Sequence, residues 1–134
     1  MKNYDDIGKL LLRLTIGILL LMHGLFKLAN GLDSITTLVL AQGWPAWLAF
    51  GVLIGEVIAP SLLIIGVLTR VGALVIVFNM CIAIYLAHAS QILLLTKTGG
   101  WALELQGLFL LGALVVALLG AGRFSLGGSY GRLN

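Results

Sequence analysis

Long apolar runs alternate with short polar stretches along this chain. Four such runs occupy residues 10–28, 46–66, 71–94 and 102–120. Each is close to the about 20 helical residues that cross a hydrocarbon core about 30 Å thick. The pattern therefore predicts an all-α membrane protein in which residues 1–134 form one domain, a bundle of four transmembrane helices.

The first connection, residues 29–45, is the longest. Asp33 or Ser34 can cap a short helix there that carries Ile35 and Val39 among its apolar positions. We expect this helix to lie along the membrane surface on the outer side. The other two connections are short, which makes consecutive helices antiparallel.

Lysine and arginine are distributed unequally between the two ends of the predicted bundle. Six of them fall at the end that carries both termini, namely Lys2, Lys9, Arg13, Arg70, Arg123 and Arg132, and two fall at the other end, Lys27 and Lys97. Because basic loops resist export, we expect the N-terminus and the C-terminus in the cytoplasm and residues 29–45 outside.

Composition excludes several classes of protein. With 60% hydrophobic and 10% charged residues, the chain cannot build a water-soluble surface. The net charge of +3 is small and its basic residues are scattered, so nucleic acid is not an expected partner. Asp5, Asp6 and the length of the first run indicate a retained anchor and not a signal peptide. A single cysteine, Cys81, excludes an intramolecular disulfide.

Helix phase predicts which sides of the spans are buried. In the first run, one arc of about 120° holds Arg13, Gly17, Leu20, His23, Gly24 and Lys27. In the second run, Gly51 and Gly55 form a pair of small residues that would let a neighbouring backbone approach beside Glu56.

Five polar side chains inside or beside the runs are the candidate ligand-binding residues: His23, Glu56, Asn79, His88 and Glu104. Such groups are costly in a bilayer unless they face the bundle interior. Glu56 falls near the midplane, Asn79 close to it, and the other three in the outer half. We therefore predict a shared polar pocket that opens to the outside or sideways into the outer leaflet.

Each candidate also has a structural interpretation. Glu56 could be a neutral carboxyl group bonded to Asn79, and the two histidines could be hydrated or bonded to backbone carbonyls. Glu104 could be only a negative charge at a helix N-terminus. On a straight helix Asn79 and His88 lie on opposite sides, while Cys81 and His88 share a face. Either the helix end bends, or the two polar side chains have separate roles.

No motif assigns a reaction to these residues. The histidines and glutamates come singly from four helices without metal-site spacing, so no metal is expected. The sequence contains no catalytic triad, phosphate-binding glycine loop or haem attachment motif. Catalytic residues are therefore unknown, and no intrinsic cofactor is expected.

Several short strings resemble one known family. They are HGLFKL at 23–28, Gly55-Glu56 followed by LLIIGVLTR at 62–70, Phe78-Asn79-Met80, His88, Gly99-Gly100-Trp101 with Glu104, and GAGRFS at 120–125. In this order and at these spacings they are similar to the DoxX family of small bacterial membrane proteins. The resemblance implies a four-helix protein of the bacterial inner (plasma) membrane. It extends over nearly the whole chain.

The resemblance implies little about activity. Similar members include the membrane subunit of an archaeal thiosulfate:quinone oxidoreductase and a component of a mycobacterial complex that links oxidative-stress defence to thiol metabolism. Carried over by position, the family's polar pattern falls on the same five candidate residues. No catalytic role is attached to any of them.

Three functional hypotheses follow. The first is a membrane subunit or accessory of a redox complex that binds a quinone or a small sulfur compound in the outer-half pocket. Electrons would come from a protein partner carrying redox centres, so the chain would be at most an oxidoreductase subunit without its own redox cofactor. The second is a non-enzymatic carrier for a lipid or another hydrophobic small molecule. The third is a structural assembly partner. Glycine stripes would also allow a homo-oligomer.

Overall fold

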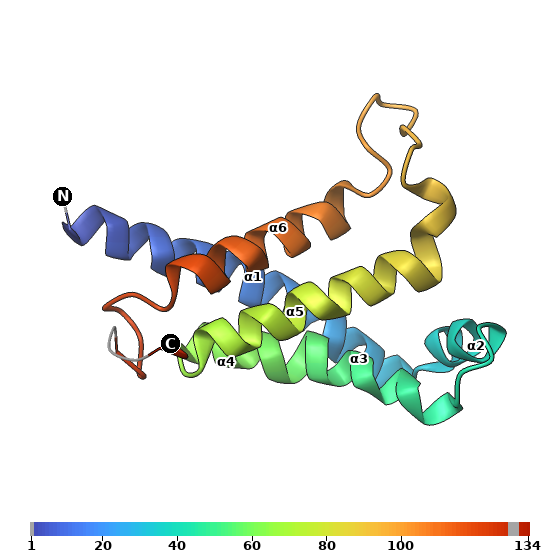
Figure 1. Ribbon diagram of the computed structural model, residues 1–134, viewed down its shortest axis with the longest axis horizontal. Coiled ribbons are helices and arrows are strands. Elements are labelled where there is room, and N and C mark those ends of the chain that lie inside the picture. The colour runs from blue at the N-terminus through green and yellow to red at the C-terminus, as the bar shows by residue number, and fades with distance from the viewer. Residues whose placement is uncertain (1, 129–131) are drawn as a thin grey trace.

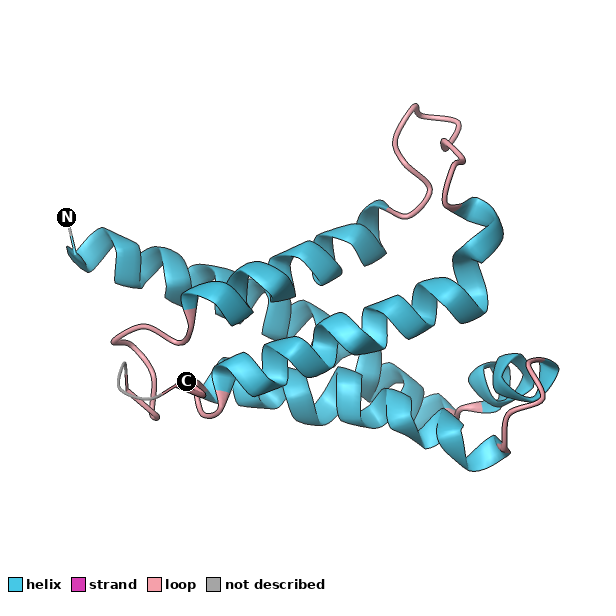
Figure 2. Ribbon diagram, in the orientation of Figure 1, coloured by secondary structure: helices cyan, strands magenta, loops and turns pink. Residues whose placement is uncertain are grey.

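The structure is a computed structural model that describes residues 2–128 and 132–134, and within them it is all-α (Figure 2). The helical segments in chain order are α1 (Lys2–Asn30), α2 (Asp33–Ala41), η1 (Ala46–Phe50), α3 (Gly51–Leu53), η2 (Ile54–Ile58), α4 (Ala59–Ile65), α5 (Thr69–Ala83), η3 (Ile84–His88), η4 (Ala89–Gln91) and α6 (Glu104–Leu119). The predicted fold class is therefore confirmed at the level of an all-α protein.

Three helical stretches are long and apolar enough to cross a membrane. They are the first span, Tyr4–Asn30 in α1, the second span, Ala46–Ile65 from η1 to α4, and the third span, Thr69–Gln91 from α5 to η4. The fourth apolar helix, α6, has only 16 residues and is about 24 Å long. The chain is thus a multi-pass membrane protein, and its fourth helix is shorter than the predicted range of 102–120.

The four apolar helices form one bundle. α1 contacts α4 and α6, and α5 contacts the same two helices, so each long helix has two neighbours. The N-terminus and the C-terminus lie at the same end of the bundle, and α2 lies at the other end (Figure 1). Leu20, Leu63, Ile76 and Ala113, one from each helix, are buried together in the core.

The stripe predicted on α1 is buried at Arg13, Gly17, Leu20 and Gly24, as expected, whereas His23 is exposed. Gly24 lies directly against the backbone of the second span: a Cβ atom there would overlap the carbonyl group of Glu56. This contact brings α1 to the turn that carries Glu56.

The close backbone approach predicted at Gly51 and Gly55 is wrong, although Gly55 is a close contact. A Cβ atom on Gly51 would meet nothing within 4 Å, so this glycine is not a close contact. A Cβ atom on Gly55 would overlap the side chain of Asn79. The small residue therefore makes room for a polar side chain of α5, and not for a neighbouring backbone.

The short helix expected in the first connection is present as α2, but its predicted cap is wrong. The N-cap residue is Leu32, and no side chain caps the helix. Asp33 instead starts the helix, and its carbonyl accepts a hydrogen bond from the Thr37 hydroxyl at 2.9 Å. Val39 is buried, and α2 packs on η1, so the helix covers the end of the bundle through its apolar side.

The end with the termini is closed by the segment after α6. Gly120 and Gly122 have φ angles of +76° and +75°, which glycine adopts readily and which turn the chain back under the bundle. The Gly127 amide then donates to the Gly66 carbonyl at 2.9 Å, and Thr69 donates to the Asn134 side chain at 3.0 Å. These contacts cover the turn between the second and third spans.

Candidate functional site

An ion pair joins α1 to the second span. The Lys27 ammonium donates to both carboxylate oxygens of Glu56 at 2.6 Å, and among the described residues it forms the one salt bridge. The Glu56 side chain is 4% exposed and that of Lys27 is 30% exposed. Lys27 lies in the last turn of α1, where a cation also interacts favourably with the helix dipole. The buried carboxylate is thus neutralised by a cation that reaches in from the end of the bundle that carries α2.

Glu56 and His88 both lie in π-helical turns, η2 and η3. A π-helical turn closes hydrogen bonds five residues apart and rotates the chain less per residue than an α-helix does. It therefore changes which side chains share a face. Both Asn79 and His88 line one cavity, while Cys81 is exposed and does not line it. Of the two alternatives given for Asn79 and His88, a bend at the end of the third span is the one observed (Figure 1). The expectation that Cys81 and His88 share a face is wrong.

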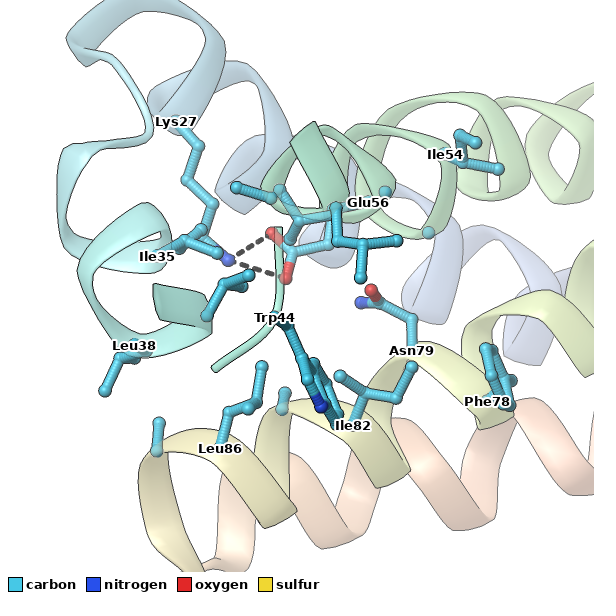
Figure 3. A pocket seen from close by; sticks show the side chains of 18 of the residues that line it. Lys27, Ile35, Leu38, Trp44, Ile54, Glu56, Phe78, Asn79, Ile82 and Leu86 are labelled. Carbon is cyan, nitrogen blue, oxygen red and sulfur yellow. Dashed lines mark hydrogen bonds and ion pairs between the residues drawn. The ribbon is translucent and has the colours of Figure 1, made fainter. Parts of the chain in front are cut away.

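A cavity of about 470 Å³, here called the larger cavity, lies between the second and third spans beneath α2. Figure 3 shows Lys27 and Glu56 facing each other on one wall, with Asn79 of α5 opposite Glu56. Most other lining residues are apolar: Ile35, Leu38, Val39, Trp44, Leu48, Ala49, Val52, Ile54, Val75, Phe78, Ile82, Ala83, Leu86 and Ala87. The polar groups therefore form one patch in an apolar chamber.

Asn79 contributes an unused hydrogen-bond donor to this patch. Its side-chain nitrogen Nδ2 is buried and has no hydrogen-bond partner among the described residues. The alternative in which Glu56 is bonded to Asn79 is not observed, because the Glu56 carboxylate accepts from Lys27 instead. A buried amide without a partner costs free energy, so a ligand oxygen that met this nitrogen after a turn of the Asn79 side chain toward the cavity would be stabilised.

A smaller cavity of about 120 Å³ lies on the other side of the ion pair, between α1, α5 and α6. Lys27, Glu56 and His88 line both cavities. His23 and Gln106 line the smaller one only. The ion pair and His88 are therefore shared by the two cavities, and the smaller one has the larger proportion of polar residues in its lining.

Hydrogen bonds indicate which ring nitrogen carries the proton in both histidines. His88 Nδ1 donates to the Gln91 side-chain oxygen at 3.0 Å, and its Nε2 accepts from the Gln106 amide nitrogen at 3.1 Å. This arrangement corresponds to a neutral ring with its proton on Nδ1. His23 Nδ1 donates to the Leu19 carbonyl at 2.8 Å, and its ring stands edge-on to Phe109. Each histidine thus donates its Nδ1 proton in a hydrogen bond to the protein. Nε2 of His88 accepts from Gln106.

The structure brings four of the five predicted residues to the two cavities. Glu56, Asn79 and His88 line the larger one, and His23 lines the smaller one. Glu104 lines neither. It is exposed at the start of α6 and accepts a hydrogen bond from the Trp101 amide at 3.1 Å. Its geometry matches the alternative role of a carboxylate at a helix N-terminus.

Lys27 is the site residue that the sequence analysis missed. It was used there to orient the bundle and was placed on the buried arc of the first run, but it was not counted among the candidate ligand-binding residues. Its position on that arc, one turn after His23 and Gly24, was the signal that could have identified it. Gln106, which is hydrogen-bonded to His88, is a polar side chain inside the fourth run and could have been identified by the same energetic cost.

The site offers proton-transfer and hydrogen-bonding groups, and no metal cluster. Among the described residues, no three His, Cys, Asp or Glu side chains lie close enough together to hold a metal ion. The groups that face the larger cavity are an ammonium, a carboxylate, an amide donor and an imidazole. Together they can bind a small polar headgroup through both donors and acceptors.

The family model described as DoxX matches residues 8–89, more than half of the chain. The chain belongs to the DoxX family. The matched part contains Lys27, Glu56, Asn79 and His88, so the polar patch of the larger cavity lies within the DoxX domain. The resembling strings at 99–104 and 120–125 lie outside the match.

Neither the curated proteins nor the solved structures contain a match to this DoxX chain. Membership of the family describes a membrane protein of this type and assigns no ligand. The class of ligand therefore has to follow from the residues of the site itself.

Proposed function

We propose that this DoxX protein binds a neutral, quinone-type amphiphile, with its headgroup at the Lys27–Glu56 ion pair. The observation that carries the proposal is a buried, charge-neutral polar patch on the wall of a largely apolar cavity of about 470 Å³. Pockets of this size, mostly apolar with a few convergent polar groups, are typical of small-molecule sites.

Charge favours a neutral headgroup over an anionic one. The Lys27 cation is already paired with the Glu56 carboxylate, so the patch has no net charge. A small sulfur anion or a phospholipid phosphate would have to displace that carboxylate or lie beside it, in surroundings where charge is costly. A quinone carbonyl can accept from Lys27 or from Asn79 Nδ2, and a hydroquinone hydroxyl can donate to Glu56.

The same proposal includes the membrane topology. We infer four crossings, with α6 as the fourth, and both termini on the cytoplasmic side of a bacterial inner membrane. The excess of Lys and Arg at the end that carries the termini supports this orientation. The larger cavity then lies in the outer half of the bilayer.

The role that fits these groups is that of a membrane subunit or accessory of a redox complex. The chain positions the headgroup and places Glu56 and His88 where they can pass protons to it, while a partner protein supplies the electrons. A quinone takes up two electrons from the partner and two protons that originate in water to become a hydroquinone, and Glu56 and His88, which can relay these protons, line the cavity.

Binding can be measured through Trp44, which lines the larger cavity. We would titrate the purified protein, in a background with Trp47→Phe and Trp101→Phe that leaves Trp44 as the fluorophore, with a water-soluble benzoquinone and follow quenching of tryptophan fluorescence. Saturable quenching is expected. Glu56→Gln or Lys27→Met should weaken binding by about tenfold or more, because Lys27→Met removes a hydrogen-bond donor to the headgroup and Glu56→Gln removes the carboxylate that accepts from it.

Glu104→Gln is the matched control, because Glu104 is an exposed carboxylate outside both cavities. It should leave the dissociation constant unchanged. Binding that is equally tight in all three variants would contradict a headgroup site at the ion pair. Displacement of the quinone by phospholipid at equal concentration would favour a lipid carrier instead.

A further inference from the structure

The larger cavity has a mouth along one side, between the second and third spans. Ile54 and Phe78 line the cavity and are nevertheless 52% and 67% exposed. Leu48 and Gly51 also line it, are exposed, and precede Ile54 at three-residue spacing. Residues three apart share one helix edge, so these side chains form one rim and Phe78 belongs to the opposite rim.

The end of the cavity that faces away from the termini is covered. Leu38 and Val39 of α2 line the cavity from that end, and Val39 is buried. Trp44 lies across the cavity in Figure 3 and stacks on Tyr85 of η3, with ring centroids 6.1 Å apart. A ligand that came directly from the outer aqueous phase would have to displace this cover.

The mouth lies at the depth of the hydrocarbon core. Ile54 is two residues before Glu56 and close to the middle of the second span, Ala46–Ile65. Phe78 precedes Asn79 and lies near the middle of the third span, Thr69–Gln91. At that depth a membrane-spanning helix is surrounded by acyl chains or by other apolar helices.

We infer that the ligand enters this cavity from the bilayer and that its apolar tail leaves through the mouth between Ile54 and Phe78. The inference rests on the proposed function and defines its ligand class more closely. The ligand is a tailed amphiphile dissolved in the membrane, and not a water-soluble metabolite. Its headgroup reaches the Lys27–Glu56 pair from within the hydrocarbon, and its tail lies against the exposed edges of the two spans.

A series of benzoquinones with no isoprenoid unit, one unit or two units tests this path. Each dissociation constant is measured in the same detergent by isothermal titration calorimetry, because two of the variants introduce a further tryptophan. In the wild type, affinity should rise with tail length. In Ile54→Trp, where an indole narrows the mouth, this tail-dependent gain, measured relative to the tail-free quinone in the same variant, should fall by at least about fivefold.

Ile58→Trp is the matched control. Ile58 lies one turn further along the same span, is 55% exposed and does not line the cavity. Its variant adds the same bulk and should keep the full tail-dependent gain. Phe78→Ala removes the opposite rim without adding bulk and should lower the gain by about twofold or more.

The outcomes separate the two proposals. One outcome is that the tail-free quinone binds the wild type and that the tail-dependent gain is equal in Ile54→Trp and Ile58→Trp. This result would overturn the lateral path and would be consistent with the headgroup site. It would mean that the tail leaves past α2 or that a partner helix covers the mouth. Failure of the tail-free quinone to bind the wild type removes the headgroup site, and the tail path with it.

Discussion

The two ends of the bundle place a basic side chain of α1 in very different surroundings. Near the termini, Arg13 is buried against Gly66 and the C-terminal segment, and Nη2 donates to the Phe124 carbonyl at 2.6 Å. At the other end, Lys27 pairs with the Glu56 carboxylate at the wall of a cavity. One cation is enclosed by backbone, and the other faces a space large enough for a ligand.

The difference indicates which end carries the site. Arg13 Nε and Nη1 are buried without a hydrogen-bond partner among the described residues, but neither cavity reaches them. Arg13 therefore holds the C-terminal segment against the bundle. Lys27 is matched by an opposite charge, beside an unused amide donor and a histidine, which is the arrangement expected where a polar headgroup binds.

The largest expected effect concerns the contact between α1 and the second span at Gly24 and Glu56. Gly24→Val would force a side chain into the backbone of the second span at Glu56, and α1 would have to move away. We expect a loss of about 3 kcal/mol of stability and no quinone binding. Thermal unfolding in detergent, followed by circular dichroism, measures the loss. Gly8→Val, at a position with nothing within 4 Å, should cause much less change.

The ion pair should show strong coupling between its two members. Lys27→Met and Glu56→Gln should each destabilise the protein by about 2 kcal/mol, since each leaves a partly buried charge unpaired. The double variant should lose less than the sum of the two single losses, because no unpaired charge remains. A double-mutant cycle of unfolding free energies tests this. Additive losses would contradict a direct interaction between the two side chains.

Arg13 should behave differently from Lys27. Arg13→Met keeps the length of the side chain and removes a cation that has no acidic partner in the described part of the chain. The loss is one hydrogen bond to a carbonyl, so we expect a change in stability of at most about 1 kcal/mol in either direction. Quinone binding should stay at the wild-type level. Loss of quinone binding in Arg13→Met would contradict the claim that only the end with Lys27 carries the ligand site.

The smallest effect is expected for Glu104→Gln. This carboxylate is exposed, and glutamine retains an oxygen that can accept from the Trp101 amide. The change should cost about 0.5 kcal/mol, through the weaker interaction with the start of α6. The midpoint of thermal unfolding measures it. A large loss of stability would show that Glu104 has a further role at the end of the bundle that carries α2.

Much of the fold follows from local pattern. The ranges 46–66 and 71–94 differ by a few residues from the observed spans, Ala46–Ile65 and Thr69–Gln91. Length and apolarity determine these helices, and the glycine positions determine where α1 can approach its neighbour. The segment after α6 was not predicted, because contacts such as that of Gly127 with Gly66 join residues far apart in sequence.

The site was only partly predictable, for a geometric reason. Energetic cost identified Glu56, Asn79 and His88, which line one cavity. The partners of these side chains depend on their angular positions around each helix axis. The π-helical turns η2 and η3 change these positions relative to those calculated for a regular α-helix. Lys27 was missed for a related reason: only the packing of α1 shows that its long side chain reaches Glu56.

Native mass spectrometry of the protein extracted from its own membrane in a mild detergent tests the central claim most directly. The wild type and Arg13→Met should each retain one tailed quinone per chain, and Glu56→Gln should not. Equal retention by all three proteins, or a wild-type protein that carries no quinone, would contradict a ligand site at the Lys27–Glu56 pair.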